Sequence, residues 1–334
     1  ITVHIDSNIR DAIRSLDKGQ LGIVIVVCDN KTFKGLITDG DMRRGLLNGF
    51  TLEDKLVNIM NSKCILGSKE ISEDKANEIM QNNIIKHLPL VDCEGKYCGI
   101  YILSDQDSLE RKFDFPVLIM AGGFGKRLMP LTKDKPKPML KVNNMPILEI
   151  ILNNFKKEGF KDIYISVGYK KEVIMDYFKD GSEFGLNINY LKEEKPLGTG
   201  GCLFFLKDKI KKPLLVSNGD ILTKVNYKSL IDSHIKTDSD VSICGVSHQY
   251  QFPFGVIKEI GNGQIMIDEK PVISRIANAG IYVLNNDVYK YLEYEYRDIT
   301  DIVIGSKKVN IFTLYEDWLD VGSLDNFKLA SDFF

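Results

Sequence analysis

The stretch Leu118-Ile-Met-Ala-Gly-Gly-Phe-Gly-Lys-Arg-Leu-Met-Pro-Leu-Thr-Lys-Asp-Lys-Pro-Lys-Pro-Met-Leu140 decides how the chain folds. It opens as the end of a short apolar strand, breaks into glycines and then presents a cluster of cations. Glycines let backbone N–H groups approach an anion closely, because no Cβ stands in the way. The cations can neutralise several phosphate charges at once. The stretch therefore predicts a loop that holds a nucleoside triphosphate by its phosphates. The glycines are Gly122, Gly123 and Gly125, and the cations are Lys126, Arg127, Lys135 and Lys137.

Two better-known phosphate-binding loops do not fit this spacing. The dinucleotide-binding fingerprint needs a third glycine where Leu128 stands. The Walker A loop ends in Gly-Lys-Ser/Thr, whereas Gly125-Lys126 runs into Arg127. The order of strand, glycines, Arg127-Leu128 and Lys135-Pro-Lys-Pro138 resembles the sugar-1-phosphate nucleotidyltransferases, whose signature reads GGxGxRLxPLT followed by PKP.

The composition is that of a globular protein long enough for two domains, with 334 residues, 44% hydrophobic and 27% charged. The net charge of −2 argues against a nucleic-acid partner. No apolar run approaches the ~18 residues that span a bilayer, so we expect no membrane partner. The six cysteines form no CxxC pair and no signal peptide is visible. We therefore expect reduced thiols, no zinc site and a cytoplasmic location.

An internal repeat occupies the first third of the chain. Gly35 and Gly99 are 64 residues apart, and so are Asp41 and Asp105. Each copy is expected to run helix, apolar strand, acidic turn, second strand and helix, with first helices at 8–17 and 72–81. The Gly-x-x-Thr-x-x-Asp pattern of the first copy resembles a CBS motif. Residues 1–112 thus resemble a tandem CBS pair, a Bateman module, with copies at about 1–58 and 59–112.

The CBS resemblance implies a ligand between the two copies, with an adenine or guanine nucleotide as the effector. Carried across by position, Thr38 and Asp41 would meet a ribose, and Asp105 is the equivalent in the second copy. A carboxylate accepts well from two adjacent hydroxyl groups. In the second copy, Ile102 stands where the pattern has a threonine. The alternative is that the repeat serves only self-association.

From residue 116 onward, apolar strands alternate with helices, which predicts a mainly parallel sheet flanked by helices. The resemblance implies an α/β, Rossmann-like nucleotidyltransferase domain (glycosyltransferase-A-like) over 116–334, with a mixed sheet, preceded by the CBS module. A hairpin insertion is typical of the resembled family. The expected strands are 117–120, 163–167, 188–191, 214–217, 241–246, 255–260, 265–268, 280–284 and 309–314. The expected helices are 146–158, 171–178, 200–205, 227–235, 287–291 and 323–330.

Two aspartates match the family's metal-binding acids. Asp220 closes Ser217-Asn-Gly-Asp220 at the carboxyl end of an apolar strand, the edge where open α/β sheets bind ligands. Asp320 lies in Trp318-Leu-Asp-Val-Gly322. Isolated loop aspartates are usually solvated turn residues. The resemblance nevertheless implies that both bind Mg²⁺, a hard ion that takes oxygen ligands.

The resemblance implies nucleotidyl transfer, in which a sugar 1-phosphate attacks the α-phosphorus of a nucleoside triphosphate and pyrophosphate leaves. Positioning and charge neutralisation are enough for this chemistry. Arg127 would clamp the departing phosphates and Lys137 would bridge the α-phosphate and the sugar phosphate, acting with Asp220 and Asp320. The implied nucleotide-binding residues are Ala121, Gly122, Gly123, Gly125, Lys126, Glu193, Glu194, Gly198, Thr199, Asn218 and Gly219. The implied sugar-phosphate-binding residues are Gly255, Glu269, Lys270 and Asn278.

The choice of base rests on Glu193 and Glu194, which stand just before Leu197-Gly-Thr-Gly-Gly201, a segment that resembles the family's nucleoside loop. A carboxylate only accepts hydrogen bonds. It therefore matches the two adjacent donors of guanine and favours GTP. Some uridylyltransferases resemble this loop too, and solvated glutamates are the alternative.

The transferase part resembles GDP-mannose pyrophosphorylase-like and heptose-1-phosphate guanylyltransferase-like enzymes, few of which carry a CBS pair in front. That arrangement resembles the glucosamine-1-phosphate guanylyltransferases of bacterial legionaminic acid biosynthesis, which make GDP-glucosamine. One alternative is a guanylyl- or uridylyltransferase for another hexose or heptose 1-phosphate. Another is a nucleotide-sensing regulator with an inactive transferase domain. Both modules resemble domains that self-associate, so we expect a homo-oligomer.

Overall fold

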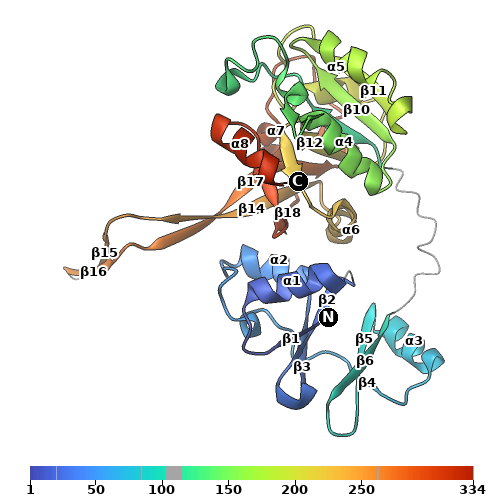
Figure 1. Cartoon of the computed structure of the whole chain (residues 1–334), viewed down its shortest axis with the longest axis vertical. Coiled ribbons are helices and arrows are strands. Elements are labelled where there is room, and N and C mark those ends of the chain that lie inside the picture. The colour runs from blue at the N-terminus through green and yellow to red at the C-terminus, as the bar shows by residue number, and fades with distance from the viewer. Residues whose placement is uncertain (20, 84, 103–114, 262, 334) are drawn as a thin grey trace. The chain divides into compact units, whose positions relative to one another are not determined.

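The computed structural model describes residues 1–19, 21–83, 85–102, 115–261 and 263–333 (Figure 1). The chain divides into two compact units. The first comprises residues 1–110 and 247–276, and the second comprises residues 111–246 and 277–334. The sequence analysis assigned all of 116–334 to one domain, so the grouping of 247–276 with the first unit differs from that assignment.

The first unit contains two three-stranded sheets of the same design. One sheet comprises β1 (Thr2–His4), β2 (Ile23–Val27) and β3 (Phe33–Thr38), with helices α1 (Ile9–Gly19) and α2 (Asp39–Leu47). The other comprises β4 (Gly67–Ser68), β5 (His87–Val91) and β6 (Tyr97–Ile102), with helix α3 (Glu73–Asn82).

The repeat expected from the sequence extends to single residues of the two hairpins. Ile23 pairs with Thr38 in the first copy, and His87 pairs with Ile102 in the second. Both hairpins shift register at equivalent places, between residues 26 and 27 and between residues 90 and 91. The two copies also share a core, in which Tyr97 and Ile100 of the second pack against buried side chains of the first.

The second unit is built on a seven-stranded sheet with the order β11-β10-β7-β12-β17-β14-β18. β7, β10, β11 and β12 are parallel, β17 is antiparallel to β12, and β18 is parallel to β14. This is the mixed α/β sheet that the sequence predicted. The strands are β7 (Val117–Met120), β10 (Asp162–Val167), β11 (Asn187–Lys192), β12 (Leu214–Asn218), β14 (Val241–Gln251), β17 (Val272–Leu284) and β18 (Val309–Leu314).

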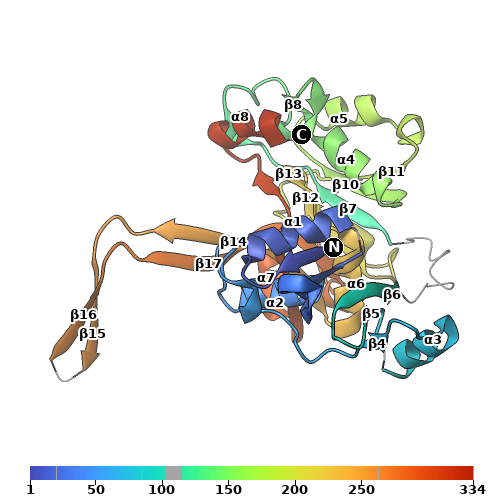
Figure 2. The same cartoon turned by 60° about the horizontal axis from the view of Figure 1, so that its bottom comes forward.

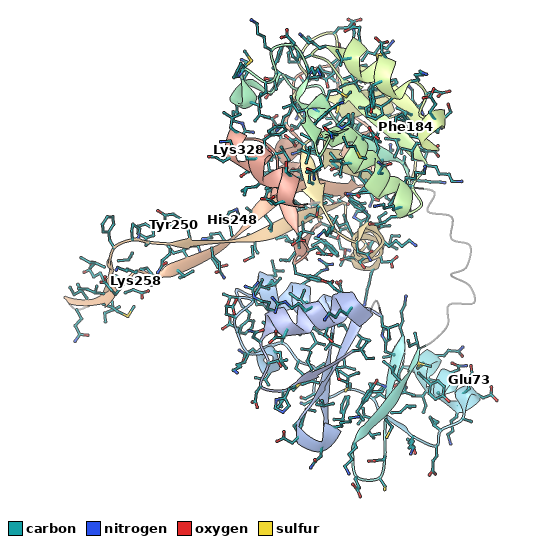
Figure 3. All side chains as sticks on the ribbon, viewed as in Figure 1. Glu73, Phe184, His248, Tyr250, Lys258 and Lys328 are labelled. Atoms are coloured by element: carbon teal, nitrogen blue, oxygen red, sulfur yellow. The ribbon has the colours of Figure 1, made fainter. Side chains whose placement is uncertain are left out.

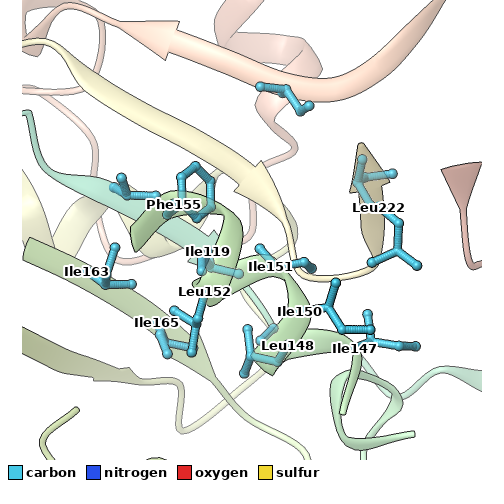
Figure 4. Packing of buried hydrophobic residues seen from close by; sticks show 14 of the residues in the cluster. Ile119, Ile147, Leu148, Ile150, Ile151, Leu152, Phe155, Ile163, Ile165 and Leu222 are labelled. Atoms are coloured by element: carbon cyan, nitrogen blue, oxygen red, sulfur yellow. The ribbon is translucent and has the colours of Figure 1, made fainter. Parts of the chain in front are cut away.

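Helices cover both faces of this sheet. Successive side chains of a strand point to opposite faces, so each strand contributes side chains to the core on either side. Ile119 of β7 packs into a core with helices α4 (Ile147–Lys157), α5 (Lys171–Phe178), α6 (Tyr227–Thr237) and α8 (Leu324–Phe333). Leu118 packs on the other side with helix α7 (Ile299–Gly305). Figure 4 shows the apolar stripe of α4, with the spacing of an amphipathic helix, packed beside Ile119, Ile163 and Ile165.

Several expected elements differ from those in the structure. The expected helices at 200–205 and 287–291 are short 3₁₀ segments, Gly201–Leu206 and Asn286–Val288. At the start of the first segment, the N–H groups of Gly200 and Gly201 both donate to the carbonyl of Arg297. Helix α7 and the strands β13 (Ile221–Thr223) and β19 (Trp318–Asp320) were not expected, because such short elements show no hydrophobic period.

A hairpin of β15 (Val256–Gly261) and β16 (Gln264–Asp268) lies in sequence between β14 and β17. Figure 2 displays β14 and β17 side by side, connected by coil to the separate two-stranded sheet of β15 and β16. Figure 3 labels His248 and Tyr250 in β14 and Lys258 in β15. A further short hairpin pairs β8 (Lys141–Val142) with β9 (Met145–Pro146). In the described part of the chain, none of the helices has both the length and the apolar character needed to cross a bilayer.

Candidate active site

The glycine loop after β7 turns on Gly125, which adopts a left-handed conformation with φ of 61°. A Cβ at this position would lie 3.0 Å from the Cβ of Lys137 and 3.0 Å from Cγ2 of Thr132. The Thr132 hydroxyl donates to the carbonyl of Gly125 at 3.0 Å. These contacts fix the loop backbone, while Lys126 and Arg127 stay exposed and available to an anion.

The loop opens onto a cavity of about 240 Å³ in the second unit. Most of the expected phosphate-binding and catalytic residues meet around this cavity, although they come from distant parts of the sequence. The lining residues are Met120, Ala121, Gly123, Gly125, Lys126, Arg127, Leu128, Lys137, Pro138, Gly219, Asp220 and Gly322. The structure thus brings together the glycine loop, the lysine of the Pro-Lys-Pro segment and both acidic loops.

A two-stranded ribbon brings the two aspartates together. β13 begins directly after Asp220, and it pairs antiparallel with β19, which ends at Asp320. Ile221 is paired with Asp320, and the Val321 N–H donates to the carbonyl of Asp220 at 3.0 Å. Gly219 in turn donates to the carbonyl of Met120 at 2.9 Å, which ties this end of the ribbon to the glycine loop.

Lys137 places its positive charge beside both aspartates. Its Nζ donates to Asp220 Oδ2 and lies 3.9 Å from Asp320 Oδ1. That Oδ1 atom is buried and has no hydrogen-bond partner. Burial, reinforced by the charge of Asp220, raises the pKa of Asp320 above its ordinary value.

The donor set of this pair fits a hard divalent cation. Mg²⁺ takes oxygen ligands and is usually held by one or two carboxylates together with substrate phosphates. Asp220 and Asp320 supply the two carboxylates, and Oδ1 of Asp320 accepts no hydrogen bond, with the Lys137 ammonium 3.9 Å away. Within the ranges that the structure describes, no cluster of three or more acidic, histidine or cysteine side chains suggests an all-protein site.

Gly322 allows Arg127 and Asp320 to approach each other. A Cβ at Gly322 would lie 2.8 Å from Asp320 Oδ1 and 3.1 Å from Nη2 of Arg127. The guanidinium and the carboxylate therefore flank the same backbone position. Gly322 closes the sequence motif that begins at Trp318, but it was not among the site residues predicted from the sequence.

Glu193 lies against the glycine loop. A Cβ at Gly122 would meet its Oε1 at 2.7 Å. The Ser166 hydroxyl donates to Oε1 at 2.5 Å, and the Leu197 N–H donates to Oε2 at 3.2 Å. Each carboxylate oxygen keeps a second acceptor position. Glu193 thus joins the phosphate loop to the nucleoside loop, while Glu194 is exposed.

The segment around Asp298 holds the nucleoside loop, residues 197–201, in place. This segment was not among the site residues predicted from the sequence. Asp298 Oδ1 accepts from both the N–H and the hydroxyl of Thr199 at 3.4 Å. The Ile299 N–H donates to the Thr199 hydroxyl at 2.9 Å. Gly198, with φ of 75°, faces the carbonyl of Arg297 at a distance that excludes a Cβ. No local sequence signal links segments that lie a hundred residues apart.

Two expected ligand-binding asparagines have contacts within the second unit. The Asn278 amide donates to the Tyr282 hydroxyl at 2.7 Å and accepts from the Gly280 N–H at 2.9 Å. Asn218 packs against Gly280, where a Cβ would lie 2.5 Å from its Nδ2. Both amides are therefore fixed in place beside β12 and β17.

Three expected sugar-phosphate residues belong to the first unit rather than to the unit of the cavity. Gly255 and Glu269 are neighbours there, since a Cβ at Gly255 would lie 2.8 Å from Glu269 Oε2. Lys270 adopts a left-handed backbone with φ of 47°. Their role in binding a sugar phosphate stays a prediction.

A second cavity, of about 280 Å³, is lined by residues of both repeat copies in the first unit. Thr38 lines it as expected, whereas the Asp41 carboxylate caps α2 by accepting from the Thr38 N–H at 2.9 Å and pairs with Arg44 at 2.6 Å. Asp105 lies outside the described residues. Lys63, Lys86 and His87 also line this cavity. They belong to no sequence motif, so the sequence did not predict them as ligand-binding residues. The full lining is Ile23, Leu36, Thr38, Asn61, Lys63, Cys64, Ile65, Ile85, Lys86 and His87.

Comparisons with known proteins match two separate parts of the chain. The profile of the nucleotidyl transferase family matches residues 116–334, and that of the CBS domain matches residues 1–48. Bifunctional protein GlmU of Methanococcus maripaludis is 36% identical over 220 residues, which cover 61% of this chain and 51% of that protein. Mannose-1-phosphate guanyltransferase of Debaryomyces hansenii is 32% identical over 223 residues, covering 63% and 62%. The chain therefore spans about half to three fifths of the length of these curated relatives.

The fold is also similar to solved structures. HddC from Yersinia pseudotuberculosis, solved in complex with GMP-PN, aligns with a TM-score of 0.54 and 25% identity. The alignment covers 66% of this chain and 99% of that chain.

Proposed function

The chain belongs to the nucleotidyl transferase family, and we propose that it transfers a nucleoside monophosphate from GTP to a sugar 1-phosphate, giving a GDP-sugar and pyrophosphate. The observation that carries this proposal is the cavity where the glycine loop, Lys137 and Asp220 meet. A polyanion and its counter-charges can be held there at close range. We place the reaction in the cytoplasm as part of the same proposal.

The chain's own residues account for the handling of phosphate. Backbone N–H groups of the loop at Gly122, Gly123 and Gly125 would hold the triphosphate. Arg127 would clamp the departing β- and γ-phosphates, and Lys137 would bridge the α-phosphate and the sugar phosphate. The sugar phosphate oxygen attacks the α-phosphorus, the bond to the pyrophosphate oxygen breaks, and pyrophosphate leaves with the electron pair. No protein nucleophile takes part, because the attacking phosphate is already ionised near neutral pH.

We propose that Asp220 and Asp320 hold Mg²⁺, in support of which stand their two carboxylates and the orphaned Oδ1 of Asp320. When bound, Mg²⁺ supplies Lewis-acid neutralisation of phosphate charge. The ribbon of β13 and β19 keeps the two acids side by side.

The proposal of guanine rests on Glu193. Its carboxylate is oriented by Ser166 and Leu197 and retains acceptor capacity for the N1–H and 2-amino group of guanine. The similarity to HddC, solved with GMP-PN, and to a mannose-1-phosphate guanyltransferase supports the same choice. A uridylyltransferase remains the alternative, and so does another hexose or heptose 1-phosphate as acceptor.

For the sugar, we propose glucosamine 1-phosphate, giving GDP-glucosamine for legionaminic acid-type glycans. The support is the CBS domain that precedes the transferase, together with the internal repeat on which the resemblance to a CBS pair rested. Gly255, Glu269, Lys270 and Asn278 are the proposed sugar-phosphate contacts.

A pyrophosphate-release assay on the full chain tests these choices. Each of GTP, UTP, CTP, ATP and dTTP is combined with the 1-phosphates of glucosamine, N-acetylglucosamine, mannose and a heptose. The proposal expects the highest kcat/KM with GTP and glucosamine 1-phosphate. Release with UTP alone would replace guanylyl by uridylyl transfer, and release from no pair would leave the inactive, nucleotide-sensing regulator.

A regulatory role for the CBS pair is a second proposal, favoured by the cavity that residues of both copies line. The Thr38 hydroxyl donates to the Asp41 carboxylate at 2.7 Å and keeps one acceptor position for a ligand, and Lys63, Lys86 and His87 offer cationic or hydrogen-bonding groups. This set suits the ribose and phosphates of an adenine or guanine nucleotide. Calorimetry on the full chain with AMP, ATP and GTP should show a binding event that Lys63→Ala and Lys86→Ala weaken and Asp220→Asn leaves in place. Flat titrations with AMP and ATP, together with GTP binding that both lysine variants retain, would leave self-association as the role of the repeat.

A further inference from the structure

The ammonium of Lys137 lies on the two aspartates to which the proposed function assigns a divalent cation. Nζ contacts Asp220 Oδ2 and is 3.9 Å from Asp320 Oδ1. The Lys137 side chain is only 10% exposed, whereas those of Asp220 and Asp320 are 23% and 35% exposed, so the lysine is largely shielded from water and the carboxylates are partly shielded. An ammonium and a divalent cation require the same carboxylate oxygens, and two positive charges repel each other strongly at such range.

The far end of Lys137 is the part that can move. Its backbone begins a 3₁₀ turn in which the Leu140 N–H donates to the Lys137 carbonyl at 3.0 Å. Its Cβ lies against Gly125, 3.0 Å from where a Cβ of that glycine would be. The backbone is therefore fixed beside the phosphate loop, while the flexible four-carbon stem can swing the ammonium within the shared cavity.

The lysine satisfies the aspartate pair only in part. It donates a hydrogen bond to Asp220, whereas Asp320 Oδ1 stays buried without a hydrogen-bond partner. A buried carboxylate oxygen that accepts no hydrogen bond is costly, and the ammonium 3.9 Å away compensates for this only through its charge. A divalent cation would satisfy both carboxylates and would displace the ammonium.

We propose that Lys137 and the divalent cation occupy the aspartate pair in turn. The inference rests on the proposed function, from which it takes the cation at Asp220 and Asp320. Lys137 is the counter-ion of the pair until the cation binds, and the displaced ammonium then pairs with phosphate in the cavity. Cation and nucleotide consequently bind with positive coupling, because the nucleotide accepts the ammonium that the cation releases.

Manganese serves as the probe, with free Mn²⁺ measured by electron paramagnetic resonance on the full chain without nucleotide. If the lysine competes with the cation, Lys137→Met should bind Mn²⁺ about 10-fold more tightly than wild type, within the usual range of coupling between sites. Added GTP should tighten Mn²⁺ binding less in this variant than in wild type. Equal or weaker Mn²⁺ affinity in Lys137→Met overturns the exchange.

Matched variants separate charge from packing. Lys137→Arg keeps the positive charge and should stay near the wild-type Mn²⁺ affinity. Lys224→Met removes the lysine of another ion pair, with Asp317 at 2.8 Å, at the other end of the same ribbon, and should change nothing. Lys137→Gln is a second neutral variant should the methionine form not fold. Mn²⁺ should raise the melting temperature of either neutral variant more than that of wild type.

The same titrations distinguish this inference from the proposed function. If wild type has no Mn²⁺ site that Asp220→Asn removes, the metal assignment itself fails. If that site exists and Lys137→Met does not bind more tightly, the assignment stands and only the exchange is wrong.

Discussion

The backbone N–H of Val321 donates a hydrogen bond to the carbonyl oxygen of Asp220 at 3.0 Å. This bond closes one end of the β13–β19 ribbon and places the side chains of Asp220 and Asp320 next to each other. A backbone ladder, rather than flexible side chains, therefore determines the spacing of the two acids. Such rigid support is what a site needs to hold charges for a transition state.

We expect Asp220→Asn and Asp320→Asn each to lower kcat by about 10²-fold or more, the scale of losing one preorganised electrostatic group. The ribbon hydrogen bonds are backbone bonds, so the fold should persist. Pyrophosphate release measures the effect, and circular dichroism checks the fold. Asp317→Asn, at the exposed end of the ribbon, is the matched control and should keep wild-type turnover. Wild-type turnover in Asp220→Asn would remove that residue from the mechanism.

Gly322→Ala should impair catalysis more than stability. The added Cβ would lie 2.8 Å from Asp320 Oδ1 and 3.1 Å from the Arg127 guanidinium, both ends of side chains that can move away. A small displacement of reacting groups can cost up to about 10²-fold in rate, so we expect a loss of about 10- to 100-fold in kcat/KM. Gly305→Ala meets no atom within 4 Å and is the control. A large drop in melting temperature with an equal loss of activity would contradict this view.

Asp298→Ala should loosen the nucleoside loop. The variant loses the bonds from the Thr199 N–H and hydroxyl and from the Tyr296 hydroxyl. We expect a cost of about 1 kcal/mol in stability, the usual net value of such bonds. The KM for the nucleotide should rise, while kcat changes little. An unchanged KM with a lower kcat would show that the loop does not depend on this anchor for binding.

The stability of the second unit should carry a pH dependence from Glu158, whose pKa burial raises from 4.5 to about 7. Between these values the folded state holds a proton that the unfolded state has released, so stability falls as the pH rises through this window. The full effect is up to about 3 kcal/mol, at about 1.4 kcal/mol for each pH unit.

Glu158→Gln keeps an oxygen for the Tyr227 N–H bond and cannot ionise. Its stability relative to wild type should therefore increase from pH 5 to pH 8. Urea unfolding followed by the fluorescence of Trp318, the single tryptophan, reports on this unit. Parallel pH curves for the two proteins would contradict the assignment.

Local sequence patterns predicted those strands and helices that are defined by the order of apolar and polar residues within the segment itself. The strand 117–120 and the helix 171–178 occur at the expected residues, because a continuous apolar run that ends before glycines defines the strand and an apolar period of 3.6 defines the helix. The 64-residue repeat also led directly to two hairpins of equal register.

Contacts between distant segments were not predictable in this way. The β13–β19 ribbon joins strands of three residues each, which are too short to show alternation. The bonds of Thr199 to Asp298 join polar residues that would be ordinary in any loop. The position of Lys137 on the aspartates depends on the packing of three loops, and a resemblance to phosphate-binding motifs does not encode it.

The two repeat copies of the first unit differ in the polar side chains that they offer to a nucleotide. This difference determines how many nucleotides we expect the unit to bind. By the 64-residue offset, Thr38 and Lys86 of the cavity correspond to Ile102 and Gly22 on the other side. The equivalent positions of the other copy thus lack this hydroxyl and this cation. We expect AMP, which is not a substrate of the proposed transfer, to bind the first unit at one equivalent per polypeptide.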